Sequence, residues 1–347
     1  MSKMYKVELR KNNSMQARII GTGSYLPKRV LTNQDLEKMV ETSDEWIVSR
    51  TGMKERRIAG ESEFTSDMGR EASLRAIASA GIKPEEIDLI LVATLTPDYV
   101  FPSTACLLQA QLKAVNAAAL DIQAACTGYI YALSLAKALI EAKTYRNILI
   151  VASEKLSSIV NYQDRNTCVL FGDGASACIV SASGKGLLIQ DVCLGADGEV
   201  AELLILPAGG SRKPATQETV AEKLHYLQMG GKETFKHAVR RMEMASKLCL
   251  ERVGLAEDQI SWLIPHQANM RIIEAIAKRF AVPMERVYLT IHKYGNTSAS
   301  SVGIALDELI TEKKLSAGEN VLLTAFGAGL TWGASVLTCS PEWGNNE

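Results

Sequence analysis

Apolar runs of two kinds alternate along the chain and predict alternating strands and helices. Residues 87–94 and 147–153 are continuous apolar runs rich in β-branched side chains, which is typical of strands covered on both faces. The segment 127–143 between them is helix-like but apolar almost all round, so we expect a helix buried inside the protein. This alternation predicts mixed or parallel sheets with helices packed on them.

The chain contains an internal repeat. Four blocks of its first half recur in the same order in the second half, three of them 173 residues further on and the last 159 residues further on. The pairs are 80–93 with 253–266, 132–143 with 305–316, 146–152 with 319–325, and 174–180 with 333–339. A duplicated α/β chain with buried helices between its sheets predicts five layers, α-β-α-β-α. We place the N-terminal half at residues 15–185 and the C-terminal half at residues 186–347.

Composition narrows the class of protein. A length of 347 residues suits two domains or one large duplicated one. The 38 basic and 39 acidic side chains give a net charge of −1, which provides no field to attract nucleic acid. No apolar run approaches the ~18 residues of a membrane span. The first 14 residues are polar and basic and lack the apolar core of a secretory signal, so we expect a disordered extension there.

Metal and nucleotide sites are not indicated. The seven cysteines have no paired spacing and the four histidines never pair at ligand spacing, so we expect neither a disulfide framework nor a metal site. Gly21 and Gly23 lack the third glycine of a dinucleotide fingerprint, and the segments 171–174 and 326–329 lack the lysine of a phosphate-binding loop. We therefore expect a cytosolic protein without disulfides, a bound metal or a glycine-loop nucleotide site.

Cys126 is the candidate nucleophile. It follows a strand-like segment, 119–125, and opens the buried helix. A thiol at a helix N-terminus is exposed to the positive end of the helix dipole, which favours the thiolate. Gly128 allows another segment or a substrate to approach closely. The alternative is that cysteine is a small buried apolar residue, and we adopt that interpretation for the other six.

Two possible partners of Cys126 lie in the second half. His266 directly follows a strand-like run that ends at a proline, and Asn296 opens the helix that matches the helix of Cys126 in the repeat. Taken singly, His266 has a structural interpretation and Asn296 that of a helix cap. Together, at element ends that converge across the duplication, the three form a candidate catalytic trio.

The chain resembles the β-ketoacyl-acyl-carrier-protein synthase III family of thiolase-fold condensing enzymes over about residues 16 to 338. The segments that carry the resemblance are 21–27, 42–52, 101–106, 124–129, 171–176, 265–272, 295–300 and 325–333. The resemblance implies the five-layer α-β-α-β-α core, a homodimer and the first condensation of bacterial type II fatty-acid synthesis. In that reaction an acyl-CoA primer, typically acetyl-CoA, condenses with malonyl-acyl-carrier protein (ACP) to give 3-oxoacyl-ACP, CoA and CO2. No cofactor is implied, since CoA and ACP thioesters are substrates.

The resemblance also implies a role for each catalytic residue. Cys126 takes the acyl group as a thioester, while His266 and Asn296 donate hydrogen bonds to the malonyl thioester and to the enolate left by loss of CO2. A second oxyanion pocket consists of the backbone N–H groups of Cys126 and Ala328. The family often has glycine at the latter position. The backbone donor survives the change to alanine, but a positive φ there would carry strain.

Further positions match substrate contacts of the family. Trp46 and Arg165 match the residues that sandwich the CoA adenine, although Trp46 alone would be interpreted as a core residue. Thr42, Arg50 and Asn269 match other CoA contacts. Phe101 matches a residue that closes the acyl pocket of the neighbouring subunit, and Phe326 is assigned to the acyl pocket. Tyr129 replaces a more usual phenylalanine, which leaves primer choice open.

The helix after His266 carries a candidate ACP-docking patch. Arg271 and Lys278 are seven residues apart and share a face, with Arg279 alongside. A solvated face is the alternative interpretation, whereas the family favours an acidic carrier protein as the partner. The proposed patch contains Gln267, Ala268, Asn269, Met270, Arg271, Lys278 and Arg279.

Other members of the fold are the remaining alternatives. A chalcone-synthase-like enzyme or a CoA-only acyltransferase would keep the nucleophilic cysteine but differ in pocket and partner. Degradative thiolases use a second catalytic cysteine in the C-terminal half, and Cys193, Cys249 and Cys339 lie in no comparable motif. A non-catalytic member would usually have lost the nucleophile.

Overall fold

The computed structural model describes residues 15–341, so the extension expected for residues 1–14 lies outside the described part. The strands are β1 (Arg18–Tyr25), β2 (Arg29–Thr32), β3 (Glu55–Ile58), β4 (Leu89–Ala93), β5 (Ala118–Ile122), β6 (Asn147–Glu154), β7 (Gly174–Ser181), β8 (Leu187–Ala196), β9 (Leu204–Ile205), β10 (Gln228–Met229), β11 (Trp262–Pro265), β12 (Asn320–Gly327) and β13 (Thr331–Cys339). The helices are α1 (Asn33–Glu37), α2 (Asp44–Thr51), α3 (Thr65–Ala80), α4 (Thr104–Leu112), α5 (Gly128–Glu141), α6 (Arg165–Cys168), α7 (Gln217–Ala221), α8 (Gly231–Val253), α9 (Met270–Arg279), α10 (Ile291–Tyr294) and α11 (Ser300–Thr311).

The main sheet shows the duplication directly. Its strand order is β5-β4-β6-β7-β1-β8-β13-β12-β11. Within it β4 and β6 are parallel, while β7 is antiparallel to both β6 and β1. The strands β11, β12, β13 and β8 repeat this order and these directions. The two sets meet through a short β1–β8 pairing, in which Arg18 and Ile19 face Leu188 and Leu187.

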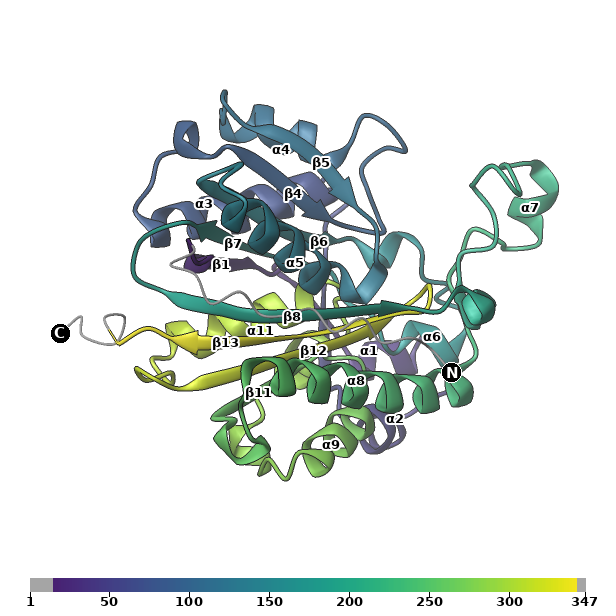
Figure 1. Ribbon diagram of the computed structural model, residues 1–347. Helices are drawn as coiled ribbons and strands as arrows, with labels where there is room; N and C mark the ends of the chain where they lie inside the picture. The colour runs from purple at the N-terminus through teal and green to yellow at the C-terminus, as the bar shows by residue number, and fades with distance from the viewer. Residues whose placement is uncertain (1–14, 342–347) are drawn as a thin grey trace.

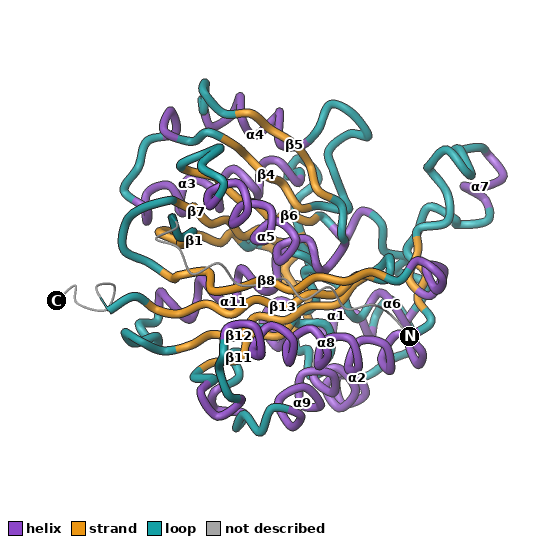
Figure 2. The backbone as a smooth tube through the Cα atoms, in the orientation of Figure 1, coloured by secondary structure: helices purple, strands orange, loops and turns teal. Residues whose placement is uncertain are grey.

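The elements stack in five layers, as Figure 1 and Figure 2 show. Helices α3 and α4 cover the outer face of the first set of strands, and α8 and α9 cover that of the second. Helices α5 and α11 lie between the two sets. Strand β6 is apolar because both of its faces are buried. Ile148 and Ile150 belong to the central core, whereas Leu149 and Val151 belong to the core under α3 and α4. The five-layer prediction is confirmed.

The buried helix predicted at 127–143 is α5. The space for it depends on Gly128, where an added Cβ would lie 2.8 Å from the Cβ of Ala93 on β4. A glycine at this position therefore permits the close approach of helix and strand. Leu133 and Ala136 of the same helix are fully buried in the central core.

A smaller projection extends from the body between β9 and α8. It carries α7 at its tip, on the right of Figure 1. At its base β9 and β10 form a two-stranded ribbon, with Leu204 opposite Met229. Both residues line the cavity described below, so the base of the projection closes one side of it.

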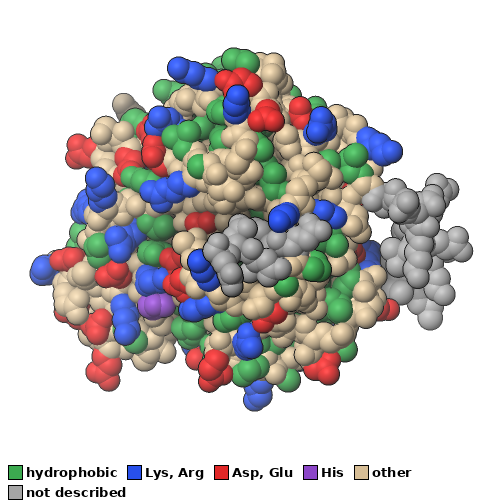
Figure 3. Space-filling view, turned by 90° about the vertical axis from the view of Figure 1, so that its left-hand side faces the viewer, with side chains coloured by type: hydrophobic (Ala, Val, Ile, Leu, Met, Phe, Trp, Pro, Cys, Tyr) green, Lys and Arg blue, Asp and Glu red, His purple; other side chains and the backbone are tan. Residues whose placement is uncertain are grey.

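The surface carries mixed charge. On the face shown in Figure 3, basic and acidic side chains are interspersed, in agreement with the net charge of −1. Among residues 15–341, no helix combines the length and the apolar character that crossing a bilayer requires.

Truncation of α5 tests the central layer. Replacing the fully buried Leu133 with alanine is expected to lower the free energy of unfolding by about 2–5 kcal/mol, because the middle layer cannot collapse into the gap. Leu135 on the same helix is 43% exposed, so Leu135→Ala should change it by no more than about 0.5 kcal/mol. Urea titrations of both variants make the comparison, and equal losses would contradict the layer assignment.

Candidate active site

One cavity collects the predicted catalytic residues. It has a volume of about 610 Å³ and is lined by Cys126, His266 and Asn296 together. Cys126 comes from the first half of the repeat and the other two from the second. The convergence expected from the duplication is therefore present in the structure.

Cys126 lies in a tight turn immediately before α5. The turn is a short 3₁₀ helix, Ala125–Thr127, and Ala125 has a φ of +44°. The thiol is buried, and this burial raises the pKa of Cys126 to about 12. Burial therefore opposes the thiolate that the helix dipole is expected to favour, and it favours the neutral thiol in the free protein.

His266 directly follows β11, as predicted, and is also neutral. Its backbone N–H donates to the carbonyl of Thr324 at 2.8 Å, and its Nδ1 lies 2.7 Å from the hydroxyl of Ser301 on α11. Burial lowers the pKa of His266 to about 3. The Ser301 hydroxyl also accepts from the backbone N–H of Gln267 at 3.4 Å. A Ser301 O–H that donates to Nδ1 leaves Nε2 with the proton, so the ring can present an N–H donor.

Asn296 is held by its own loop. It lies between α10 and α11, four residues before α11 begins, so it precedes the helix rather than opening it. Its backbone N–H donates to Leu170 at 2.9 Å, and its Oδ1 accepts the backbone N–H of Ser298 at 2.8 Å. Since the carbonyl of the side chain is occupied, the NH2 group is the part left to donate.

The turn after β12 packs on the nucleophile. An added Cβ at Gly327 would lie 2.7 Å from the backbone nitrogen of Cys126. The hydroxyl of Thr331 lies 3.0 Å from the carbonyl oxygens of both Ala124 and Ala328, so it ties the two turns together. Ala328 lines the cavity beside Cys126. Ala328 does not have a positive φ and so carries no such strain; the positive φ of this turn is at Gly329, at +138°.

Three of the five predicted CoA residues line the cavity. Arg50 and Arg165 both lie over the indole of Trp46, at 4.8 and 5.2 Å from its centroid. Trp46 is half-buried and lines the cavity, so its interpretation as a core residue is wrong. Arg50 and Asn269 line the cavity as well, whereas Thr42 and Arg165 are outside the lining.

The two predicted acyl-pocket residues have different surroundings. Phe326 is buried and lines the cavity. Phe101 is 84% exposed and does not line the cavity of its own chain. Any contribution of Phe101 to an acyl pocket therefore has to reach a second copy of the chain.

The predicted carrier-docking residues are only partly on the surface. Arg271 and Lys278 of α9 are exposed, and Arg279 forms an ion pair with Glu243 at 3.1 Å. Ala268, Asn269 and Met270 are partly exposed. Gln267 is fully buried, and its amide bonds to backbone groups of Pro265, Tyr288, Thr290 and Ile291. Its inclusion in a surface patch is wrong, because its polar atoms fix loops inside the protein.

Sequence analysis missed the apolar wall of the cavity. Phe235 and Met242 of α8 and Leu156 of the 3₁₀ turn Leu156–Ser158 line it. The α8 residues are seven apart, a helical spacing that indicates one face without showing what that face meets. Tyr129 is buried outside the lining, so its replacement of phenylalanine does not alter the pocket wall.

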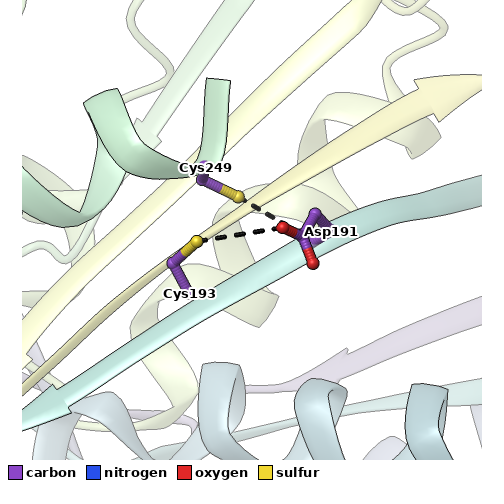
Figure 4. Close-up of side chains that lie close together, drawn as sticks. All are labelled: Asp191, Cys193 and Cys249. Atoms are coloured by element: carbon purple, nitrogen blue, oxygen red, sulfur yellow. Dashed lines mark hydrogen bonds between the residues drawn. The ribbon is translucent and has the colours of Figure 1, made fainter. Parts of the chain in front are cut away.

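A thiol cluster lies outside the cavity lining. The side chains of Asp191, Cys193 and Cys249 have ligand atoms within 4.8 Å of one another, as Figure 4 shows. The Cys249 thiol donates to the carbonyl of Asp191 at 3.4 Å, and Cys193 lies 3.9 Å from the Asp191 carboxylate. Because the two cysteines lie far apart in the sequence, sequence analysis did not indicate this contact. Each thiol has a protein oxygen as its partner, as buried neutral thiols require.

The neutral His266 makes stability depend on pH. Its pKa of about 3 in the folded protein lies below the ordinary 6.5, so the unfolded chain binds the proton more strongly and stability falls as pH drops below 6.5. By pH 5 this loss is about 2 kcal/mol. His266→Gln should lose that much less stability than wild type between pH 7 and pH 5 in urea titrations. His237→Gln, on α8, serves as the matched control, and an identical response of both variants would contradict the assignment.

Comparison with known proteins places the chain in a family. Family models described as "3-Oxoacyl-[acyl-carrier-protein (ACP)] synthase III" and its "C terminal" region match residues 120–198 and 250–339. A "Beta-ketoacyl-[acyl-carrier-protein] synthase III" of Chlamydia caviae is 60% identical over 93% of this chain and 96% of its own length. That of Caldanaerobacter subterraneus is 55% identical over 93% and 98%.

Solved structures agree. The 3-oxoacyl-[acyl-carrier-protein] synthase III of Aquifex aeolicus is 50% identical and covers 93% of this chain and 99% of its own, with a TM-score of 0.86. The priming β-ketosynthase of the R1128 polyketide pathway is 35% identical, covers 96% and 100%, and has a TM-score of 0.87. With the nucleophile turn and both donors in one cavity, this chain belongs to the β-ketoacyl-acyl-carrier-protein synthase III family.

Proposed function

We propose that Cys126, His266 and Asn296 perform the condensation of this family in the cavity. The chain is a condensing acyltransferase, which joins an acyl-CoA primer to malonyl-ACP and so initiates fatty-acid synthesis. We propose acetyl-CoA as the primer and a homodimer as the assembly. The observation that carries the proposal is the convergence of a buried thiol with two uncharged hydrogen-bond donors in one cavity.

In the first step Cys126 attacks the carbonyl carbon of the primer thioester. The S–C bond to Cys126 forms, the bond to CoA breaks, and the acyl group is held as a thioester. We propose that the N–H groups of Cys126 and Ala328 bind the oxyanion, which the contact between their two turns supports. No backbone hydrogen bond from either N–H is present among the described residues, so both are free to donate.

In the second step malonyl-ACP replaces CoA. Loss of CO2 from the malonyl group leaves an enolate, whose oxygen accepts hydrogen bonds from Nε2–H of His266 and the NH2 group of Asn296. Preorganised donors of this kind are typically worth ~2.7–4 kcal/mol each. The enolate carbon then attacks the acyl-Cys126 carbonyl, giving 3-oxoacyl-ACP. Neutral donors suit this step, because a cationic histidine would instead bind the malonyl carboxylate and oppose its loss.

The proposed homodimer rests on an exposed apolar loop, and the proposed cytoplasmic location rests on the free cysteines. The loop before α4 exposes Val100 to 91% and Phe101 to 84%, and exposed apolar tips of this kind mark contacts with another chain. We propose that this loop reaches the partner subunit, where Phe101 closes the acyl pocket. All seven cysteines are free thiols, which fits a cytoplasmic location.

Substitution of the catalytic residues separates the two steps. Cys126→Ala should abolish the mass increase of one acetyl group that acetyl-CoA gives wild type, whereas Cys106→Ala, at an exposed thiol, should keep it. Asn296→Ala should retain the acetyl adduct yet condense about 10²–10³-fold more slowly, because it lacks one enolate donor. Intact-mass spectrometry and a malonyl-ACP assay give the two readings. A normal adduct on Cys126→Ala would overturn the mechanism.

Carrier docking is tested on α9. We propose that Arg271 and Lys278 attract the acidic carrier, with Ala268, Asn269, Met270 and Arg279 around them. Lys278→Glu should raise KM for malonyl-ACP roughly fivefold, the effect of about 1 kcal/mol of surface attraction, and the difference should shrink in high salt. Arg70→Glu, on the distant α3, is the matched control. Equal KM values for the two variants would exclude this face.

A further inference from the structure

Glu154 is a buried carboxylate that the mechanism above does not use. It ends β6, and its side chain is fully buried. Its Oε2 accepts hydrogen bonds from the hydroxyls of Thr94 and Thr96, at 3.2 and 2.6 Å, and from two backbone N–H groups at 3.2 Å. Its Oε1 accepts only the N–H of Leu95, at 3.3 Å. One oxygen is therefore fully engaged, and the other can take a further partner.

Ser298 lines the part of the cavity that adjoins this carboxylate. It lines the cavity together with Cys126 and Leu95, and the backbone N–H of Leu95 donates to Glu154 at 3.3 Å. The Ser298 hydroxyl also lowers the pKa of both Cys126 and Glu154. The hydroxyl is buried and makes no hydrogen bond of ordinary geometry within the described residues. The backbone of Ser298 has a φ of +53°, a conformation that costs energy in a residue other than glycine. A buried hydroxyl without such a partner, on a strained backbone, therefore lies in the cavity wall.

The first step needs an acceptor for the thiol proton. His266 has no free acceptor when the Ser301 hydroxyl donates to its Nδ1, because its Nε2 then carries the proton that the enolate requires. Asn296 has no basic group. Burial raises the pKa of Glu154 to about 7, which suits a group that exchanges a proton near neutral pH.

The charged surroundings of Glu154 do not supply another acceptor. At the cavity, the charge of Glu154 acts on Cys126 and raises the pKa of that thiol, and His266 lies in the lining of the same cavity. Lys155 follows Glu154 in sequence, but its ammonium donates to the carbonyls of Gly60 and Glu63, at 2.9 and 2.7 Å.

We propose that Glu154 is the proton acceptor for Cys126 during acyl transfer, with the Ser298 hydroxyl as the relay. As Sγ attacks the primer carbonyl, the S–H proton passes to Ser298 Oγ while the Ser298 proton passes to Glu154. The bond from Sγ to the acyl carbon forms and the bond from that carbon to the CoA sulfur breaks. The relay returns its proton to the CoA sulfur, which shares the same carbon in the tetrahedral adduct, and CoA leaves as the thiol.

The same relay resets the enzyme. After CoA has left, Glu154 takes up one proton from solvent, the one proton that decarboxylative condensation consumes overall. Collapse of the second tetrahedral adduct expels Cys126 as a thiolate, which takes that proton from Glu154 through Ser298, so Glu154 is ionised again for the next cycle. The inference rests on the proposed role of Cys126, but it concerns only the path of the proton.

The test is the pH dependence of acyl-Cys126 formation from acetyl-CoA alone, followed by rapid quench and intact mass. In wild type the rate should rise with pH through about 7 and then level off, because Glu154 must be ionised to accept the proton. Glu154→Gln should be at least about 10²-fold slower and lack that inflection. Ser298→Ala should also be slower but keep the inflection, and it retains the backbone N–H that holds Asn296.

Controls separate catalysis from folding. Asp173→Asn removes another fully buried carboxylate, which bonds to Ser157 and Ala59 away from the cavity lining; it should lower stability while keeping the wild-type pH profile. Unchanged acylation rate and inflection in Glu154→Gln would overturn the relay. If that variant fails to fold, an unchanged rate in Ser298→Ala overturns it instead. Absence of any acetyl adduct in wild type would contradict the role of Cys126 itself.

Discussion

The whole site depends on one close contact between the halves of the duplication. The turn that carries Cys126 lies directly against the end of β12, at a point where a Cβ on Gly327 would reach 2.7 Å from the Cys126 nitrogen. Thr331 bonds to both turns and fixes their spacing. This contact brings Ala328 into the lining of the cavity together with Cys126. Because His266 and Asn296 come from the second half, the same packing that joins the two sets of strands also assembles the catalytic groups.

Burial then decides the charge state of the assembled groups. It raises the pKa of the Cys126 thiol and lowers that of the His266 imidazole, so both are neutral in the free protein. Hydrogen bonds fix the orientation of His266 and Asn296. The Ser301 hydroxyl bonds to Nδ1 of His266, and the backbone N–H of Ser298 donates to Oδ1 of Asn296. The cavity therefore presents uncharged donors in fixed directions, which favours the stabilisation of negative charge that develops only during the reaction. Because the thiol is neutral and these groups act as donors, the thiol needs a separate proton acceptor.

The sequence predicted the parts of the molecule that depend on pattern, and missed those that depend on packing. The repeat and the apolar runs together indicated the five layers. A strand that is buried on both faces has a continuous apolar run, such as 147–153, which a single sequence is enough to show. The motifs located Cys126, His266 and Asn296. The buried position of Gln267 and the contact between Cys193 and Cys249 could not be predicted, because each depends on how segments distant in sequence meet. Glu154 was missed for the same reason: a single glutamate in a strand looks like a surface residue until its neighbours are known.

A crystal structure of the acetylated protein tests the central claim most directly, since it shows where the acyl carbonyl is bound. The account predicts an acetyl group on Cys126 whose oxygen lies within hydrogen-bond distance of the N–H groups of Cys126 and Ala328, with His266 and Asn296 facing the empty space from which the malonyl carbon attacks. An acetyl oxygen bonded instead to His266 and Asn296, or an acetyl group on another cysteine, would contradict the division of the cavity into two oxyanion pockets.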